Sequence, residues 1–194
     1  MHPKEANMNR SHARGKSRLP ATILLLMLLV MLPASAGCGM MPGGAGGGKA
    51  AEQFPDFALQ DINGNPVDQT VFAGHALTMV NIWGTFCGPC IQEMPDLGKL
   101  ARELEANHDA TVLGIVVDIR DADTLALARQ ITSESKADFT HLVMGEDLNG
   151  YLSQFEYIPT TVFVNRDGQV VGDPVVGGNG YDEYLAMVKR LLAP

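Results

Sequence analysis

The feature that most constrains this chain is a pair of cysteines, Cys87 and Cys90, placed where an apolar run ends and a helix-like pattern begins. The run over residues 76–83 is almost continuously apolar, which is typical of a central strand buried on both faces. Two cysteines at this spacing between a strand and a helix predict a redox-active dithiol that can close a small disulfide ring. Cys87 would lie at the helix N-terminus, where unpaired N–H groups and the helix dipole favour a thiolate. Pro89 suits the first helical turn, because its missing N–H costs nothing there. We therefore expect Cys87 to be the nucleophile and Cys90, one turn deeper, to be the resolving thiol.

A zinc half-site and a purely structural disulfide are the alternatives for this cysteine pair. A zinc site needs two further ligands at suitable spacing. The chain has no second Cys-x-x-Cys motif, and its histidines are scattered, so we expect neither a metal nor another cofactor. His75, His108 and His141 are interpreted as surface or loop residues without a role.

Residues 1–37 read as a signal peptide that does not belong to the fold. The apolar run over 21–32 is about a dozen residues long, whereas a membrane span needs roughly 20. Small residues then lead to Cys38, which resembles the lipidated cysteine of bacterial lipoproteins, although Ser35 stands where such motifs usually carry an aliphatic residue. Lipidation of Cys38, ordinary cleavage after Ala36 and an uncleaved anchor remain open. All three place the domain outside the cytoplasmic membrane, as a lipid-anchored or secreted protein. The basic residues before the run are Lys4, Arg10, Arg14, Lys16 and Arg18.

Residues 38–51 form a glycine-rich linker, and residues 52–194 form the predicted globular domain. Without residues 1–37 the chain has nine Lys and Arg against 21 Asp and Glu, a net charge of −12. This acidic balance argues against nucleic acid or anionic lipid as a partner of the domain.

The domain alternates predicted strands and helices and then ends in a hairpin and a helix, which indicates an α/β fold around a mixed sheet. An Asn-Gly pair at 63–64 indicates a hairpin near its start. Pro95 is expected to bend the helix that follows the cysteines. The predicted strands are 57–60, 76–83, 111–117, 142–144, 160–165 and 170–176. The predicted helices are a short turn at 71–74 and longer segments at 94–106, 121–132, 147–155 and 181–192.

Several motifs together resemble the TlpA/ResA class of extracytoplasmic thioredoxin-like thiol-disulfide oxidoreductases. They are the run Val80-Asn81-Ile82-Trp83-Gly84-Thr85-Phe86-Cys87-Gly88-Pro89-Cys90, then Glu93-Met94-Pro95, Ile158-Pro159-Thr160-Thr161 and Asn165-Arg166-Asp167-Gly168. The resemblance covers about residues 52–192. It implies a thioredoxin-like fold, with a central mixed sheet flanked by helices and an N-terminal hairpin extension.

The resemblance also implies roles for individual residues. Cys87 would attack a client disulfide, and Cys90 would resolve the mixed disulfide by forming the Cys87–Cys90 disulfide. Ile158 and Pro159 match a loop with a cis proline that faces the cysteines and offers its backbone to an extended client. Glu93 matches an acidic residue that influences the proton chemistry of the cysteines, although a glutamate in the first turns of a helix can also serve the helix dipole.

Three further positions depart from or add to that pattern. Asn81 stands where cytoplasmic thioredoxins carry a buried aspartate, so we do not expect the proton acceptor there. Phe86 replaces the usual tryptophan before the first cysteine and keeps an aromatic lid. Phe86 and Trp83 complete the candidate client-binding set, although Trp83 is interpreted more readily as a core residue.

The leading functional hypothesis is a membrane-tethered, monomeric disulfide reductase. Its Gly-Pro dipeptide between the cysteines resembles that of the reducing thioredoxins, and it would receive electrons from a membrane donor. By resemblance, its client would be apocytochrome c or an extracytoplasmic methionine sulfoxide reductase. A disulfide-forming oxidase, a thioredoxin-fold peroxidase and a noncatalytic binding module are the alternatives.

Overall fold

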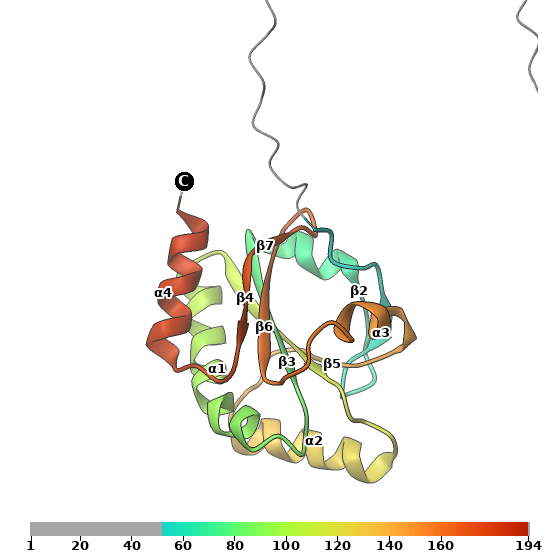
Figure 1. Cartoon of the computed structure of the whole chain (residues 1–194). Helices are drawn as coiled ribbons and strands as arrows, with labels where there is room; N and C mark the ends of the chain where they lie inside the picture. Colours follow the sequence, from blue (N-terminus) through green and yellow to red (C-terminus); the bar gives the residue numbers. More distant parts are fainter. Residues whose placement is uncertain (1–51, 194) are drawn as a thin grey trace, which may run out of the picture. The chain divides into compact units, whose positions relative to one another are not determined.

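The structure is a computed structural model, and it describes residues 52–193. A mixed sheet of five strands forms the centre of this part of the chain (Figure 1). Its strand order is β5-β4-β3-β6-β7. β3, β4 and β5 run parallel, whereas β6 and β7 are antiparallel to their neighbours. The strands are β3 (Leu77–Trp83), β4 (Ala110–Val116), β5 (His141–Val143), β6 (Thr160–Asn165) and β7 (Val170–Val176). This is the predicted thioredoxin-like α/β arrangement.

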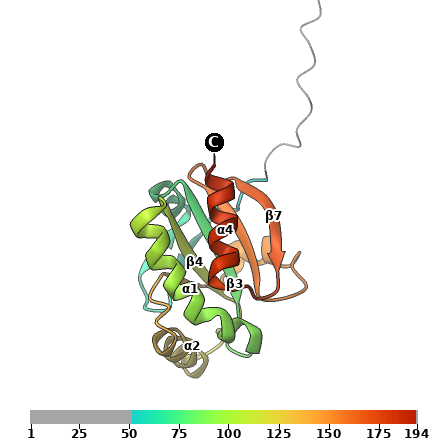
Figure 2. The ribbon, with the colours of Figure 1, turned by 90° about the vertical axis from the view of Figure 1, so that its left-hand side faces the viewer.

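Helices α1 (Gly88–Asn107) and α4 (Tyr181–Leu192) lie side by side over one face of this sheet (Figure 2). The side chains of a strand alternate between its two faces. Met79, Asn81 and Trp83 of β3 therefore point toward the layer that contains α1 and α4, where an apolar cluster buries Met79 and Trp83. Val80 and Ile82 point the other way, into a second cluster that includes α3 (Glu146–Leu152). Asn81 is thus a polar residue within the layer that carries the cysteines.

The predicted N-terminal hairpin is present as a separate two-stranded sheet that lies beside β5, the edge strand of the main sheet. It pairs β1 (Ala58–Gln60) with β2 (Pro66–Asp68). Its turn contains Gly64 with φ of 88°, a conformation that glycine adopts without strain. The Ile62 amide donates to the His141 carbonyl at 2.8 Å, so the turn covers the outer edge of β5. The short helix η1 (Gln69–Gly74) leads from the hairpin into β3.

The observed elements follow the expected ones closely, with β6, β7 and α4 having the predicted bounds. α1 begins earlier than its apolar periodicity indicates, directly after Cys87, and it continues through Pro95. α2 (Ala122–Glu134) starts at a capping box in which the Asp121 side chain accepts from the Thr124 amide. One expectation was wrong: His141 is a buried residue of β5, because its ring packs against Trp83 and Phe139 and not toward solvent.

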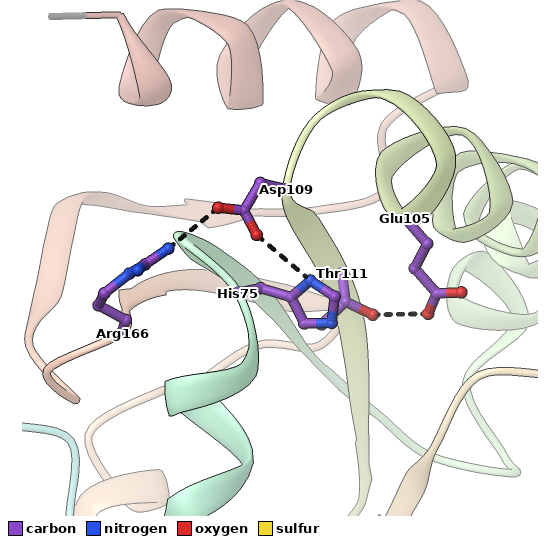
Figure 3. A network of polar contacts seen from close by, with 5 residues as sticks. All are labelled: His75, Glu105, Asp109, Thr111 and Arg166. Atoms are coloured by element: carbon purple, nitrogen blue, oxygen red, sulfur yellow. Dashed lines mark hydrogen bonds and ion pairs between the residues drawn. The ribbon is translucent and has the colours of Figure 1, made fainter.

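A polar network joins three turns at the end of the sheet opposite the cysteines (Figure 3). Asp109, before β4, accepts from Arg166 of the β6–β7 turn at 3.0 Å, and its other oxygen lies 3.8 Å from His75, before β3. Arg166 and Asp109 are exposed, and exposed pairs of this kind contribute little to stability. The network therefore marks the end of the sheet that is not involved in the chemistry.

Among residues 52–193, no helix is both long and apolar enough to cross a membrane. The predicted signal peptide, Cys38 and the glycine-rich linker lie outside the described residues, as does Pro194.

Candidate redox site

The two cysteines form a disulfide at the N-terminus of α1, with Cα atoms 5.2 Å apart. Cys87 is the N-cap residue, and its sulfur accepts from the Cys90 amide at 3.2 Å. Pro89 lies in the first turn, as predicted. Cys87 retains 6% of its exposed surface, whereas Cys90 is fully buried. Cys87 is therefore the sulfur that a client can reach, and Cys90 can act only from within the protein.

The loop before β6 faces this disulfide. The Ile158–Pro159 peptide bond is cis, as the resemblance implied. The Ile158 carbonyl oxygen lies 3.6 Å from the Cys87 sulfur. The Gly177 amide, after β7, donates to the Pro159 carbonyl at 2.8 Å and holds the loop from the side. The structure thus brings Cys87, Ile158 and Pro159 together.

Large apolar side chains are exposed around the cysteine and the proline loop. Phe86, before Cys87, exposes 73% of its surface, Tyr157, before Ile158, exposes 67%, and Val176, at the end of β7, exposes 60%. The register pairs Val176 with Thr160, which places it beside the cis-proline loop. We call Phe86, Tyr157 and Val176 the apolar rim. Sequence reasoning found only Phe86, because Tyr157 and Val176 lie far from the cysteine motif in the chain.

Trp83 does not belong to this surface. It is fully buried beneath the site and packs against His141 with ring centroids 5.5 Å apart. Its placement among the candidate client-binding residues was therefore wrong, and the interpretation of Trp83 as a core residue is confirmed. The reason is that β3 is a central strand with both faces covered.

Glu93 is almost completely buried on α1, one turn after Cys90. Residues three positions apart on a helix are neighbours on one face. Its carboxylate accepts from the Asn81 side-chain amide at 2.9 Å, the Asn179 backbone amide at 3.0 Å and the Tyr184 hydroxyl at 3.2 Å. These donors come from β3, the β7–α4 loop and α4. Sequence reasoning found Glu93 but not Asn179 or Tyr184, and it gave Asn81 no part in the proton chemistry.

Burial raises the pKa of Glu93 above its ordinary value, because an ionised carboxylate loses its hydration inside the protein. The three hydrogen bonds oppose this effect, because they favour the ionised form. Burial, together with the nearby Glu93 charge, raises the pKa of Tyr184 to about 12. Tyr184 is therefore a neutral hydroxyl, and Glu93 is a carboxylate suited to exchange a proton.

A second carboxylate fixes the loop that leads to the cysteines. Asp118, just beyond β4, accepts from the Thr85 backbone amide at 3.0 and 3.1 Å and from the Thr85 hydroxyl at 2.6 Å. Sequence analysis did not single out either residue. Their contact holds the turn between β3 and Cys87 against the end of β4.

Among residues 52–193, no group of three or more His, Cys, Asp or Glu side chains is placed to hold a metal ion. The two sulfurs are joined to each other, and a zinc ligand would have to be a free thiolate. The arrangement is suited to thiol-disulfide exchange.

Residues 49–185 match the family model described as Redoxin. The chain is 27% identical over 124 residues to the thiol-disulfide oxidoreductase ResA of Halalkalibacterium halodurans, a match that covers 63% of this chain and 66% of that protein. It is 30% identical over 128 residues to the thioredoxin-like protein YneN of Bacillus subtilis, covering 65% of this chain and 71% of that one.

Solved structures show the same fold. A thioredoxin-family thiol:disulfide interchange protein from Chlorobium tepidum matches with a TM-score of 0.63 and 22% identity, over 75% of this chain and 99% of that one. A protein described as a putative thiol:disulfide interchange protein DsbE, also from Chlorobium tepidum, matches with a TM-score of 0.60 and 24% identity, over 74% and 97%. The chain therefore belongs to the Redoxin family, as a thioredoxin-fold thiol-disulfide oxidoreductase with the redox pair Cys87 and Cys90.

Proposed function

We propose that this protein is a membrane-tethered, extracytoplasmic reductase of protein disulfides. The observation that carries the proposal is the buried pair of Cys90 and Glu93 on one face of α1. A fully buried thiol cannot release its proton directly to water. A carboxylate with a raised pKa on the next turn can accept that proton when the resolving thiolate is needed.

The reaction begins with both cysteines reduced. The Cys87 thiolate attacks one sulfur of the client disulfide and forms a mixed disulfide. The other client sulfur leaves as a thiolate, which takes a proton from water in place of the one that Cys87 lost on ionisation. Glu93 accepts the proton of the Cys90 thiol, and the Cys90 thiolate attacks the Cys87 sulfur. This step forms the Cys87–Cys90 disulfide and releases the second client thiolate, which takes up the proton. Two electrons have then passed from the protein to the client, with one proton from Cys90 by way of Glu93 and one proton from water, and a membrane donor must return the two electrons to the protein.

The apolar rim and the cis-proline loop form the client-binding surface in this proposal. Only Cys87 of the pair reaches the surface, and the rim residues are next to it in the chain or beside the cis-proline loop that faces it. The backbone of Ile158 is beside the sulfur. These features suit an extended, apolar segment of polypeptide around the client disulfide.

The signal-like N-terminus and the glycine-rich linker support a domain tethered outside the cytoplasmic membrane. The resemblance of the motifs to the TlpA/ResA class is the basis for apocytochrome c as the client, with a methionine sulfoxide reductase as the second candidate. We expect the protein to act as a monomer, because the site is complete within one chain.

The midpoint potential of the Cys87–Cys90 couple tests the direction of the reaction. We expect a value below roughly −220 mV for the full-length protein equilibrated with glutathione or dithiothreitol, because reducing thioredoxins lie near −270 mV. A value near about −120 mV is that of an oxidant. A measured potential in that range would show that the protein is a disulfide-forming oxidase and not a reductase.

Replacement of Cys90 tests the roles of the two sulfurs. Cys90→Ala leaves Cys87 able to attack but removes the resolving thiol, so mixed disulfides with clients should accumulate on nonreducing gels. Cys87→Ala is the matched control, because Cys90 is buried and should trap nothing. Equal trapping by both variants, or none by either, would contradict the assignment. The trapped clients, identified by mass spectrometry, would also decide between apocytochrome c and the sulfoxide reductase.

A further inference from the structure

The hydroxyl of Tyr184 belongs to a buried ring of hydrogen bonds that includes Glu93. Asn81 and Thr161 are directly paired residues of β3 and β6. The Asn81 amide nitrogen lies 2.9 Å from one Glu93 oxygen and 3.1 Å from the Thr161 hydroxyl. The Thr161 hydroxyl lies 3.1 Å from the Tyr184 hydroxyl, which lies 3.2 Å from the other Glu93 oxygen. The four side chains thus form a closed ring inside the protein.

The donors in this ring have one consistent direction. The Asn81 nitrogen has two hydrogens, of which one goes to Glu93 and the other to Thr161. Thr161, having accepted one hydrogen bond, donates its own hydrogen to Tyr184, and Tyr184 donates to Glu93. Two of the hydrogens end on the carboxylate, and the other two support Tyr184 as a donor to it, so this arrangement stabilises the ionised form of Glu93.

The same ring can also accommodate a protonated Glu93. The two hydroxyl groups rotate, so a carboxyl proton can be donated to Tyr184 and the Tyr184 hydrogen to Thr161. The Asn81 carbonyl oxygen is buried and has no hydrogen-bond partner among residues 52–193. An unpaired buried acceptor is costly, so its presence here needs a reason.

We infer that Tyr184, acting with Thr161 and Asn81, is a positioning residue that controls how readily Glu93 exchanges a proton with the Cys90 thiol. The inference rests on the proposed function, because it assumes that Glu93 is the proton acceptor. It adds that α4, at the far end of the chain, takes part in the redox chemistry through one hydroxyl. No residue of α4 is among the sequence motifs of the site.

Tyr184 differs from the other hydrogen-bond partners of Glu93 because its side chain can titrate. Among the described residues that hydrogen-bond to Glu93, Asn81 and the Asn179 backbone cannot titrate, so Tyr184 is the one titratable neighbour. On α1 itself, Cys87 and Cys90 titrate once the disulfide is reduced. Burial raises the pKa of Tyr184 to about 12, so the hydroxyl stays a donor throughout the working range.

Tyr184→Phe is the direct test, because it removes the hydroxyl and keeps the ring. Loss of one donor to the carboxylate should raise the pKa of Glu93 further. We expect the pH profile of disulfide exchange by the full-length protein to move upward by about one unit, and the rate below that inflection to fall about tenfold. Carbon NMR of labelled glutamate should show the same upward shift in the titration of Glu93.

Matched variants distinguish the effect of the Tyr184 hydroxyl on Glu93 from an effect of the substitution on core packing. Tyr151→Phe makes the same change in α3, where the ring packs against Phe54 and Phe155, and should leave the profile in place. Thr161→Val breaks the chain one step further out and should shift the profile in the same direction, whereas Thr161→Ser should restore it. The threonine pair also tests the inference if Tyr184→Phe fails to fold.

Glu93→Gln separates a failure of the inference from a failure of the proposed function. If it abolishes the inflection while Tyr184→Phe and Thr161→Val leave the wild-type profile unchanged, the Tyr184 inference is wrong and the role of Glu93 stands. If Glu93→Gln itself retains the inflection, the proposed proton acceptor is wrong.

Discussion

Phe86 illustrates at the scale of single residues how the site combines exposure and burial. Its ring is largely exposed, next to a cysteine that is almost buried. A large apolar ring in contact with water gains little from packing in the free protein. A side chain at the Gly84 position would come within 3.0 Å of this ring and 3.2 Å of the Ile158 side chain. Phe86 therefore lies close to the cis-proline loop, where it can cover a bound client.

We predict that Phe86→Ser and Tyr157→Ser weaken client reduction without altering the redox couple. Partial burial of an aromatic ring by the client contributes on the order of 1 kcal/mol, so kcat/KM for a protein disulfide should fall roughly fivefold, mainly through KM. The midpoint potential should stay the same. Leu127→Ser, on an exposed apolar residue of α2, is the control and should have no effect. An equal loss of kcat/KM in all three variants would show that the apolar rim is not part of the client-binding surface.

His141 is a buried histidine for which sequence reasoning had no signal. Burial lowers its pKa to about 4, because the charged ring would lose its hydration, and only its bond to the Ala137 carbonyl at 3.0 Å and the charge of Asp61 oppose this. The folded protein thus keeps His141 neutral where an unfolded chain protonates it. The contribution of neutral His141 to the free energy of unfolding is fully present above about pH 6.5 and is lost as the pH falls toward 4.

We predict that His141→Phe removes part of this acid sensitivity. The wild type should lose up to about 3 kcal/mol of unfolding free energy through this group between pH 6.5 and 4, and the variant should not. Urea unfolding at several pH values measures the difference. The comparison at pH 8, where histidine is neutral in both states, gives the effect of the substitution itself. Parallel curves for the two proteins would show that His141 is not held neutral.

Helix α1 shows at the scale of elements how a backbone contact sets the position of the cysteines. Gly98 faces the loop between α2 and β5, and a Cβ atom there would lie 2.3 Å from the Lys136 carbonyl oxygen. The same oxygen accepts from Arg102 at 3.0 Å. Because a backbone oxygen cannot move aside like the end of a side chain, α1 needs glycine at this contact.

We predict that Gly98→Ala destabilises the protein by about 1–3 kcal/mol, since it forces α1 away from this loop. Gly150→Ala in α3 is the matched control, because nothing lies within 4 Å of the added methyl group. That control should gain up to about 1 kcal/mol from the better helix propensity of alanine. Denaturant unfolding of both variants measures the contrast. If Gly98→Ala leaves the free energy of unfolding unchanged, α1 can shift at this point without cost.

At the scale of the whole molecule, the chemistry is concentrated at one end of the sheet. The disulfide follows the carboxyl end of β3, the Asp118 contact follows that of β4, and the cis-proline loop precedes β6. The opposite end holds the polar network of Asp109, Arg166 and His75 (Figure 3). The strand directions bring these distant segments together, because the parallel strands β3 and β4 end at the same edge and the antiparallel strand β6 begins there.

Much of this arrangement could be predicted from local pattern. The run before Cys87 predicted the central strand, and the motif predicted the disulfide, because both depend on residues that are neighbours in the chain. Pro159 and Glu93 were identified through resemblance. His141 was assigned wrongly to the surface, and Trp83 was a core residue although it was also placed in the client-binding set, because whether a ring is buried depends on which elements cover its strand.

The sequence by itself determined the redox chemistry of this protein, since a dithiol at a strand–helix junction needs only four consecutive residues and their flanks. The tertiary structure alone decided the environment of that dithiol. Asn81, Thr161, Asn179 and Tyr184 meet around Glu93 from separate elements, and no periodicity in the chain marks them as neighbours. The reason is physical: the pKa of a carboxylate depends on its burial and on the donors around it, which exist only when the chain is folded.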